Sequence, residues 1–301
     1  YQSMWLDEGL SREFAQRSTA AIIDLARTAD LHPPLYYLFL HIVGPLSDFN
    51  ATALRSWSSV WYVLFLLVLY KRLIGSVPGS RWLRAGLLAA AALVPFGVFY
   101  ASELRSYSAV ILISALQFFA FTDLVTAAPT RTRSSQWRYG IYSFLSLWLF
   151  YPSAFTLVAH FLYVVIRQRA AWWRCFWPWF VVTVLYSPWL LSVVVQRAGV
   201  EPTHFLALPW WQIPAIIAAG FAGGRVAVTD LNHLHHYWPT ALALTGLVIG
   251  LSGLWQWWQN DRRNFFMEQV WWVLGLPAVI CLLISATRFS IFDPRYYTQL
   301  F

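Results

Sequence analysis

The chain opens with a pair of acidic side chains in a setting suited to proton transfer. Residues 5–9 read WLDEG, so Asp7 and Glu8 come directly after a short apolar segment. A carboxyl group beside an apolar surface is partly desolvated, which raises its pKa and suits it to general-base catalysis. The same two acids are also typical of a helix start, where the backbone dipole favours negative charge. Asp7 and Glu8 are therefore candidate catalytic residues, with a helix-stabilising role as the alternative.

A histidine and two tyrosines follow in residues 30–37, which read DLHPPLYY. Proline suits the first turn of a helix because its missing N–H would have no partner there. A helix start attracts anions, and His32 can add a hydrogen bond or a positive charge. We therefore take His32 as a candidate phosphate-binding residue and Tyr36 as a candidate pocket residue. The alternative is that His32 is only a capping or interfacial side chain.

A third polar group occupies residues 101–107, which read ASELRSY between two long apolar stretches. Ionisable side chains at the edge of an apolar span are functional candidates, although they can also act as anchors that reach for the interface. Glu103 is a candidate catalytic residue, Arg105 a candidate phosphate-binding residue and Tyr107 a candidate pocket residue.

The last polar group is residues 292–297, which read FDPRYY. A guanidinium group stays charged and presents a planar fork that matches a phosphate, so Arg295 is a further candidate for binding a phosphate. The histidines of residues 232–236 lack a diagnostic zinc spacing and fit a hydrated loop better. The sequence leaves a metal site undefined.

The composition identifies the environment in which these groups must work. Hydrophobic residues make up 59% of the chain, charged residues only 11%, and the mean hydropathy is +0.53. Soluble proteins carry about 25% charged residues, so this chain lacks the polar surface that a soluble fold of its size needs. The 19 tryptophans suit the headgroup level of a bilayer. The composition predicts an integral membrane protein.

Apolar stretches of membrane-spanning length recur along the chain and define an all-α polytopic fold. The predicted spans, about eight in number, are residues 53–71, 84–102, 106–126, 138–151, 153–167, 175–196, 238–258 and 268–287. Without a linker or an internal repeat between them, residues 1–301 are predicted to form a single transmembrane domain. The chain begins without Met and ends as a new apolar segment starts, so we expect a truncation at both ends.

The basic residues set the predicted orientation. Twelve of the 21 Lys and Arg residues fall in four short loops. These loops are every second connection between the predicted spans, so all four lie on the same side of the membrane. Cytoplasmic loops are enriched in Lys and Arg, so these loops are assigned to the cytoplasm. This clustering explains the net charge of +8 better than nucleic-acid binding does, and no nucleic-acid partner is expected.

The same assignment places ten of the thirteen carboxylates on the non-cytoplasmic side. Residues 1–52 then form a first external loop and residues 197–237 a long later one. Residues 33–46 are apolar but too short to span, and a span there would invert every later loop. They are predicted to form a re-entrant or interfacial helix on the outer face.

The polar motifs follow one another in a recognisable order, and all are predicted to lie on the non-cytoplasmic side. WLDEG, DLHPPLYY, ASELRSY and DPRYY together resemble the GT-C superfamily of glycosyltransferases that use polyprenyl-phosphate sugars. The chain is most similar to the bacterial branch related to protein O-mannosyltransferases, lipid A aminoarabinose transferases and rhizobial lipopolysaccharide sugar transferases. The resemblance implies a GT-C-like bundle of transmembrane helices with a juxtamembrane helix in the first external loop.

The resemblance also implies an activity and a set of roles. The activity is the inverting transfer of one sugar from a polyprenyl-phosphate donor to a glycan, lipid or protein acceptor outside the cytoplasm, in a bacterial inner or plasma membrane. The family's catalytic Asp falls on Asp7, its helix-opening polar residue on His32, its second-loop acid on Glu103 and its late Arg on Arg295. The membrane lipid is a further expected partner.

A cofactor is not required by this chemistry, although Asp7, Glu8 and Glu103 could share a divalent cation. A transporter or flippase of lipid-linked sugars is the main alternative, and it would favour polar residues near the middle of the spans. A glycan polymerase or ligase is the second alternative, and it would use an oligosaccharide donor at the same outer face.

Overall fold

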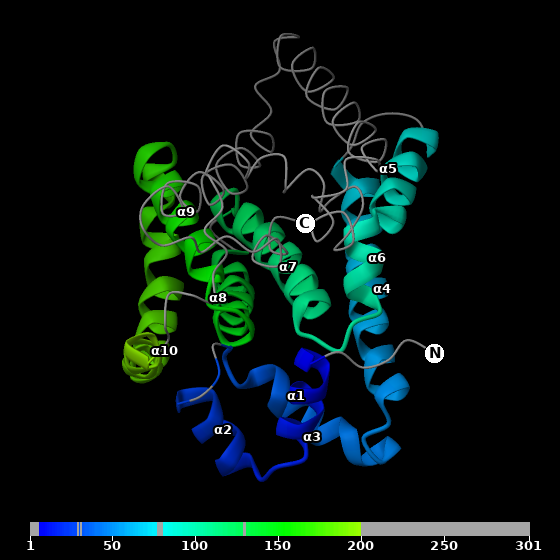
Figure 1. Ribbon diagram of the computed structural model, residues 1–301. Coiled ribbons are helices and arrows are strands. Elements are labelled where there is room, and N and C mark those ends of the chain that lie inside the picture. The colour runs from blue at the N-terminus through cyan, green and yellow to red at the C-terminus, as the bar shows by residue number, and fades with distance from the viewer. Residues whose placement is uncertain (1–5, 29, 31, 77–80, 129–130, 200–301) are drawn as a thin grey trace, which may run out of the picture.

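The computed structural model describes residues 6–28, 30, 32–76, 81–128 and 131–199, and every regular element in these ranges is a helix (Figure 1). The α-helices are α1 (Leu6–Ala15), α2 (Thr19–Thr28), α3 (Leu35–Val43), α4 (Ala51–Ser76), α5 (Arg81–Leu93), α6 (Pro95–Ala101), α7 (Tyr107–Val125), α8 (Thr132–Leu149), α9 (Ser153–Ile166) and α10 (Trp172–Gly199). Two short 3-10 helices, η1 (Gly44–Ser47) and η3 (Arg169–Ala171), follow α3 and precede α10. The all-α prediction is confirmed for this part of the chain.

Three segments of the described chain are long and apolar enough to cross a membrane: Ala51–Arg72, Tyr107–Val125 and Arg169–Ser192. They coincide with three of the predicted spans. Each contains at least 18 residues with few charges, which is close to the length that a hydrocarbon core requires. These helices are consistent with an integral membrane protein.

Two further predicted spans form shorter or more polar helices. The predicted span 138–151 falls in α8 up to Leu149, and α8 carries polar and basic side chains in its first half. The predicted span 153–167 corresponds to α9, an apolar helix of 14 residues that ends at Ile166. Both run beside the longer helices in the bundle (Figure 1). The spans at 238–258 and 268–287 and the loop at 197–237 lie wholly or mostly outside the described residues, so the total number of spans stays a prediction.

The predicted span at 84–102 is interrupted. The backbone is extended at Val94, and α6 begins at Pro95 after α5 ends. Proline has no N–H, so it cannot bond the carbonyl four residues earlier, which is that of Ala91. The hydroxyl of Tyr62 on α4 donates to this carbonyl. Hydropathy is continuous through the stretch and therefore gave no sign of the break.

The three N-terminal helices gather at one end of the bundle (Figure 1). Residues 33–46, predicted to be a short interfacial helix, form α3 and η1, and Leu35–Ser47 is a short apolar helical segment. Ile42 and Leu46 on this segment are exposed, as expected for a helix that lies in a membrane interface. Asn50 caps α4, because its side-chain oxygen accepts from the N–H groups of Thr52 and Ala53.

Basic side chains meet at the opposite end of the bundle, where α4 and α7 end and α8 and α10 begin. Both guanidinium nitrogens of Arg72 donate to the carboxylate of Asp123, at 2.9 and 2.7 Å, and Arg138 lies 3.6 Å from the same carboxylate. Arg174 donates to the carbonyls of Val125 and Ala127 at the end of α7. We call these residues the basic end.

Candidate functional site

The turn between α6 and α7 carries Glu103 and Arg105, and neighbouring hydroxyl groups fix its backbone. From α4, Ser58 donates to the carbonyl of Glu103 at 2.6 Å and Ser59 donates to that of Ala101 at 2.7 Å. Ser108 on α7 donates to the carbonyl of Tyr100 at 2.7 Å. The carbonyls of Tyr100 and Glu103 also accept backbone N–H groups within the turn, and the three hydroxyl groups add further bonds that fix its backbone.

Glu8 connects this turn to α1 and α4. Its carboxylate accepts from two guanidinium nitrogens of Arg55, with Nε at 2.9 Å, and from the backbone N–H of Leu104 at 2.8 Å. The Glu8 side chain is 2% exposed and that of Arg55 is 16% exposed. A buried carboxylate with three donors is well compensated, so Glu8 is placed to hold the structure together.

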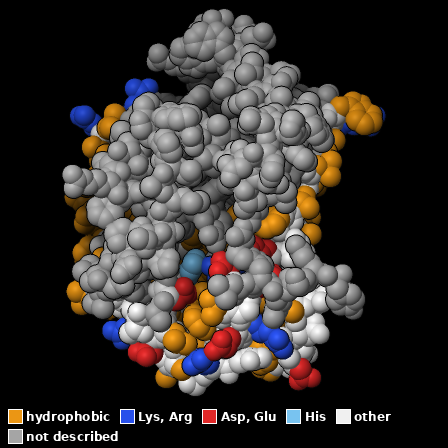
Figure 2. Space-filling model, viewed as in Figure 1, with side chains coloured by type: hydrophobic (Ala, Val, Ile, Leu, Met, Phe, Trp, Pro, Cys, Tyr) orange, Lys and Arg blue, Asp and Glu red, His pale blue; other side chains and the backbone are white. Residues whose placement is uncertain are grey.

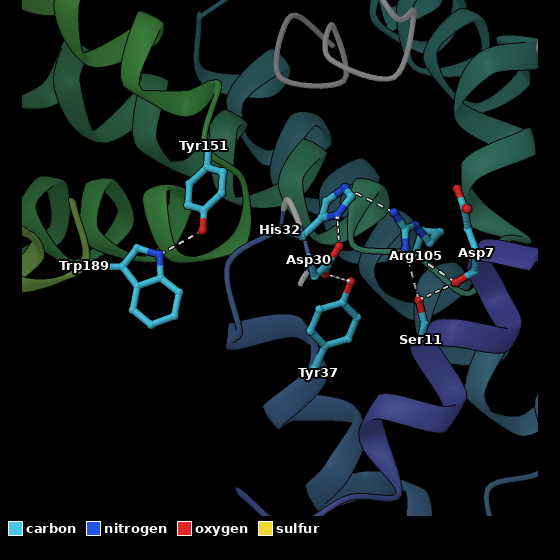
Figure 3. Close-up of polar contacts among 8 residues, drawn as sticks. All are labelled: Asp7, Ser11, Asp30, His32, Tyr37, Arg105, Tyr151 and Trp189. Atoms are coloured by element: carbon cyan, nitrogen blue, oxygen red, sulfur yellow. Dashed lines mark hydrogen bonds and ion pairs between the residues drawn. The ribbon is translucent and has the colours of Figure 1, made fainter. Parts of the chain in front are cut away.

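Arg105 lies at the centre of a second set of contacts (Figure 3). One guanidinium nitrogen, Nη1, donates to Ser11 Oγ at 3.3 Å and reaches the backbone carbonyl of Asp7 at 3.5 Å. The other, Nη2, lies 3.1 Å from His32 Nε2. Ser11 also donates to the Asp7 carbonyl at 2.9 Å. The Arg105 side chain therefore bridges α1 and the loop before α3.

The contacts continue from His32 to an aspartate. His32 Nδ1 lies 3.1 Å from one carboxylate oxygen of Asp30, and the hydroxyl of Tyr37 donates to the other. We call Asp7, Ser11, Asp30, His32, Tyr37 and Arg105 the Arg105 network. Its members come from α1, the 30–34 loop, α3 and the α6–α7 turn, which lie far apart in the sequence.

The electrostatics of the Arg105 network favour the charged forms of Arg105 and Asp30. Burial alone raises the pKa of Asp30, but bonds from His32 and Tyr37 and the charge of Arg105 outweigh it, so the net direction is downward. Burial alone lowers the pKa of Arg105, yet the neighbouring tyrosines Tyr107 and Tyr37 and the carboxylates of Asp7 and Asp30 outweigh it, so the net direction is upward. Arg105 is a permanent cation that is only 6% exposed.

Buried tyrosine rings lie within the network and beside it. Tyr36, Tyr37 and Tyr107 are buried, and Arg105 Cζ lies 5.9 Å from the centroid of the Tyr107 ring. Burial raises the pKa of Tyr36 and, together with the charge of Asp30, that of Tyr37. These hydroxyls stay protonated at neutral pH, and that of Tyr37 donates to Asp30.

Asp7 is oriented differently from its neighbours. Its backbone carbonyl faces Arg105 and Ser11, whereas its carboxylate points away from both (Figure 3). The side chain is partly exposed, in contrast to that of Glu8. On the face in Figure 2, acidic, basic and histidine side chains gather close to the N-terminal helices, with hydrophobic side chains on the flanks. A general base must be reachable by substrate, and of the two acids in the first turn of α1 Asp7 meets this condition better.

The structure brings seven of the eight predicted site residues to the same end of the bundle. These residues are Asp7, Glu8, His32, Tyr36, Glu103, Arg105 and Tyr107. Glu103 is 4% exposed, and its side chain lies with Glu8 and Arg105 among the groups that act on Tyr36. Arg295 lies outside the described residues.

Sequence reasoning missed Arg55, Ser11, Asp30 and Tyr37 as members of this site. Arg55 was detectable, since it is an ionisable residue near the outer end of a predicted span, and such residues usually have a partner or a function. Asp30 was visible beside His32, but its bond with Tyr37 depends on how α3 turns back on the loop. Ser11 gave no signal that separates it from any helical serine.

The described part of the chain contains no group of three or more His, Cys, Asp or Glu residues placed to hold a metal ion. Asp7, Glu8 and Glu103, the carboxylates that could share a divalent cation on sequence grounds, therefore do not form such a group. Among them the Glu8 carboxylate already binds Arg55 and the N–H of Leu104.

Comparison of the chain with protein-family models, with curated proteins and with solved structures gives no match.

Proposed function

We propose that this protein is a membrane glycosyltransferase of the GT-C type, which transfers one sugar from a polyprenyl-phosphate donor to an acceptor on the non-cytoplasmic side. The observation that carries the proposal is the Arg105 network. In it a buried permanent cation, Arg105, contacts His32 and the backbone carbonyl of Asp7, whose side chain is partly exposed. The network lies where long apolar helices end, so a lipid tail and a charged headgroup can be bound together.

In the proposed reaction, the Asp7 carboxylate accepts the proton of an acceptor hydroxyl. The hydroxyl oxygen bonds to the anomeric carbon of the sugar as the bond from that carbon to the phosphate oxygen breaks. General-base assistance of this kind contributes about 10²–10⁴ in rate. Attack from the face opposite the phosphate inverts the anomeric centre.

The leaving polyprenyl phosphate gains negative charge in the transition state. Fixed cations at that position lower the barrier because they act on the transition state more than on the ground state. Arg105 and His32 supply this role in the proposal, with Arg295 as a third candidate. Tyr36 and Tyr107 line the pocket.

The geometry changes one proposed role. Glu8 was expected to take part in catalysis, but its carboxylate is occupied by Arg55 and the Leu104 N–H. In the proposal Glu8 is a positioning residue that fixes the α6–α7 turn relative to α1. Glu103, on that same turn, orients Arg105 or the acceptor.

The two ends of the bundle fit a polarised membrane protein. The basic end holds members of three of the four clusters that the positive-inside rule assigns to the cytoplasm, and the Arg105 network lies at the other end (Figure 1). We place the basic end in the cytoplasm and the active site on the outer face of a bacterial inner or plasma membrane. The fold is then a GT-C-like bundle with α3 as its juxtamembrane helix.

The experiment that tests the proposal is mass spectrometry of envelope glycans and polyprenyl-phosphate sugars in a deletion strain. The strain is complemented with the full-length protein, with its Asp7→Asn variant, or with Asp24→Asn, which removes an exposed carboxylate on α2. Wild type and Asp24→Asn are expected to restore one glycan decoration. Asp7→Asn should lose it while a lipid carrying a single sugar persists or accumulates. Equal restoration by all three would exclude Asp7 as the base and favour a transporter.

A further inference from the structure

The contact between Arg105 and His32 fixes the tautomer of the histidine. A guanidinium group has only donors, so His32 Nε2, which lies 3.1 Å from Arg105 Nη2, must be the acceptor. The hydrogen of a neutral imidazole is then on Nδ1, which faces the Asp30 carboxylate at 3.1 Å. His32 is therefore neutral in this arrangement, with each ring nitrogen in the only role that its partner allows.

The two sides of the ring differ in charge. Nδ1 faces the carboxylate of Asp30, which belongs to the same loop and also accepts from Tyr37 on α3. Nε2 faces Nη2 of Arg105, which lies on the α6–α7 turn. The other terminal nitrogen of this guanidinium group, Nη1, donates to Ser11 on α1. The charged and titratable groups that surround the ring, directly or through Arg105, are Asp7, Asp30, Tyr37, Arg105 and Tyr107.

Protonation changes only one of these contacts. The bond from Nδ1 to Asp30 is kept, because Nδ1 is the donor in both forms. At Nε2, however, a new N–H would face an N–H of Arg105, and two like charges would lie side by side. An anion placed between the two groups removes this conflict, since it accepts from both cations at once.

We propose that an isoprenyl phosphate anion binds Arg105 and His32 together, with uptake of one proton from solvent onto Nε2 of His32. The bond between Arg105 and His32 is replaced by one bond from each to the phosphate oxygens. The proton returns to solvent when the anion leaves. The class of anion rests on the proposed function, whereas the coupling rests on the geometry alone.

Linkage gives the coupling a measurable form. If binding takes up one proton, the Kd falls as the pH falls, by at most about tenfold per pH unit. The probe is methyl farnesyl phosphate, a diester whose single charge is constant over this range. A phosphate monoester is unsuitable because its own second ionisation lies near pH 6.

The experiment is titration calorimetry of the full-length protein in lipid nanodiscs, at several pH values from about 8.5 to about 6.5 and in two buffers with different ionisation enthalpies. Wild type is expected to bind more tightly at low pH and to take up protons on binding. His32→Gln is the matched variant, because its amide oxygen can accept from Arg105 but cannot be protonated. It should bind as wild type does at the high end of the range, with a Kd that stays constant.

Two results would overturn the inference. If wild type and His32→Gln show the same pH dependence, another group takes up the proton. If wild type does not bind the probe at any pH, the anion site itself is wrong. The probe contains no sugar, so proton-coupled binding without transfer from a sugar-carrying donor would refute the proposed function and leave this inference standing.

Discussion

The two ends of the bundle use the same residue types in different surroundings. At the basic end, the side chains of Arg72 and Asp123 are 35% and 27% exposed, and Arg138 is 50% exposed. At the N-terminal end, Glu8 and Arg105 are almost fully buried. An exposed ion pair is screened by water and contributes little, whereas a buried charge requires a complete set of partners.

This difference separates anchoring from chemistry. The contacts of the basic end tie helix termini to one another and can be formed by any residues of suitable charge. The contacts of the Arg105 network hold a cation, a histidine and a carboxylate in fixed positions, which is what charge stabilisation in a transition state requires. Variants at the two ends can break or sharpen this contrast.

The largest difference in stability is expected between Glu8→Gln and Asp123→Asn. Glu8→Gln removes the buried carboxylate charge that accepts from Arg55 and from the N–H of Leu104, which destabilises the fold by on the order of 3 kcal/mol. Asp123→Asn removes an ion pair that is partly exposed, at a cost of about 1 kcal/mol or less. Thermal unfolding in detergent, followed by tryptophan fluorescence, measures both. Equal losses of Tm would show that burial does not distinguish the two ends.

A smaller effect, with a pH signature, is expected from Asp30→Asn. The pKa of Asp30 is lowered in the folded protein, so its contribution to stability is complete above the ordinary pKa near 4 and is lost as pH falls through the lower folded value. Asp30→Asn should therefore lower the Tm at neutral pH and reduce its decline in acid. If the Tm of wild type and variant differ by the same amount at all pH values, the charge of Asp30 is not the stabilising feature.

The smallest effect is expected at the basic end, from Arg174→Gln. Arg174 donates to the carbonyls of Val125 and Ala127, which lie at the negative end of the α7 dipole. Replacing it should cost about 0.3–1 kcal/mol and leave anion binding at the other end unchanged. The same unfolding assay and the methyl farnesyl phosphate titration check both statements. A loss of binding would show that the two ends are coupled.

For the described residues, the sequence predicted that the charged groups discussed above separate into two ends. Each apolar stretch of spanning length takes the chain across the membrane once. The number of stretches between two motifs therefore tells whether they share a side, and it separated Asp7, His32 and Arg105 from the basic clusters. The helical start of α1 at two acids was the alternative reading of that motif, and the short helix α3 was predicted from an apolar stretch too short to span. These features depend on local sequence, which hydropathy and charge describe well.

The pairings within the site depended on distant packing and could not be predicted. Glu8 and Arg55 are 47 residues apart, and their contact requires the angle at which α1 meets α4. The interruption at Val94 gave no signal in hydropathy, because an apolar stretch gives the same hydropathy whether its backbone is continuous or broken; Pro95 was the one sequence signal of it. Hydropathy reports transfer into lipid, and it contains no information about hydrogen-bond geometry.

The most direct test of the central claim, that the chemistry belongs to the Arg105 end, is a comparison of Arg105→Lys with Arg72→Lys. Both changes keep the charge and remove the guanidinium fork. Sugar decoration of the envelope is measured by mass spectrometry in the complemented deletion strain at matched protein levels. The account predicts a loss of about tenfold or more for Arg105→Lys and near wild-type decoration for Arg72→Lys. Equal decoration by the two variants, or a selective loss in Arg72→Lys, would contradict it.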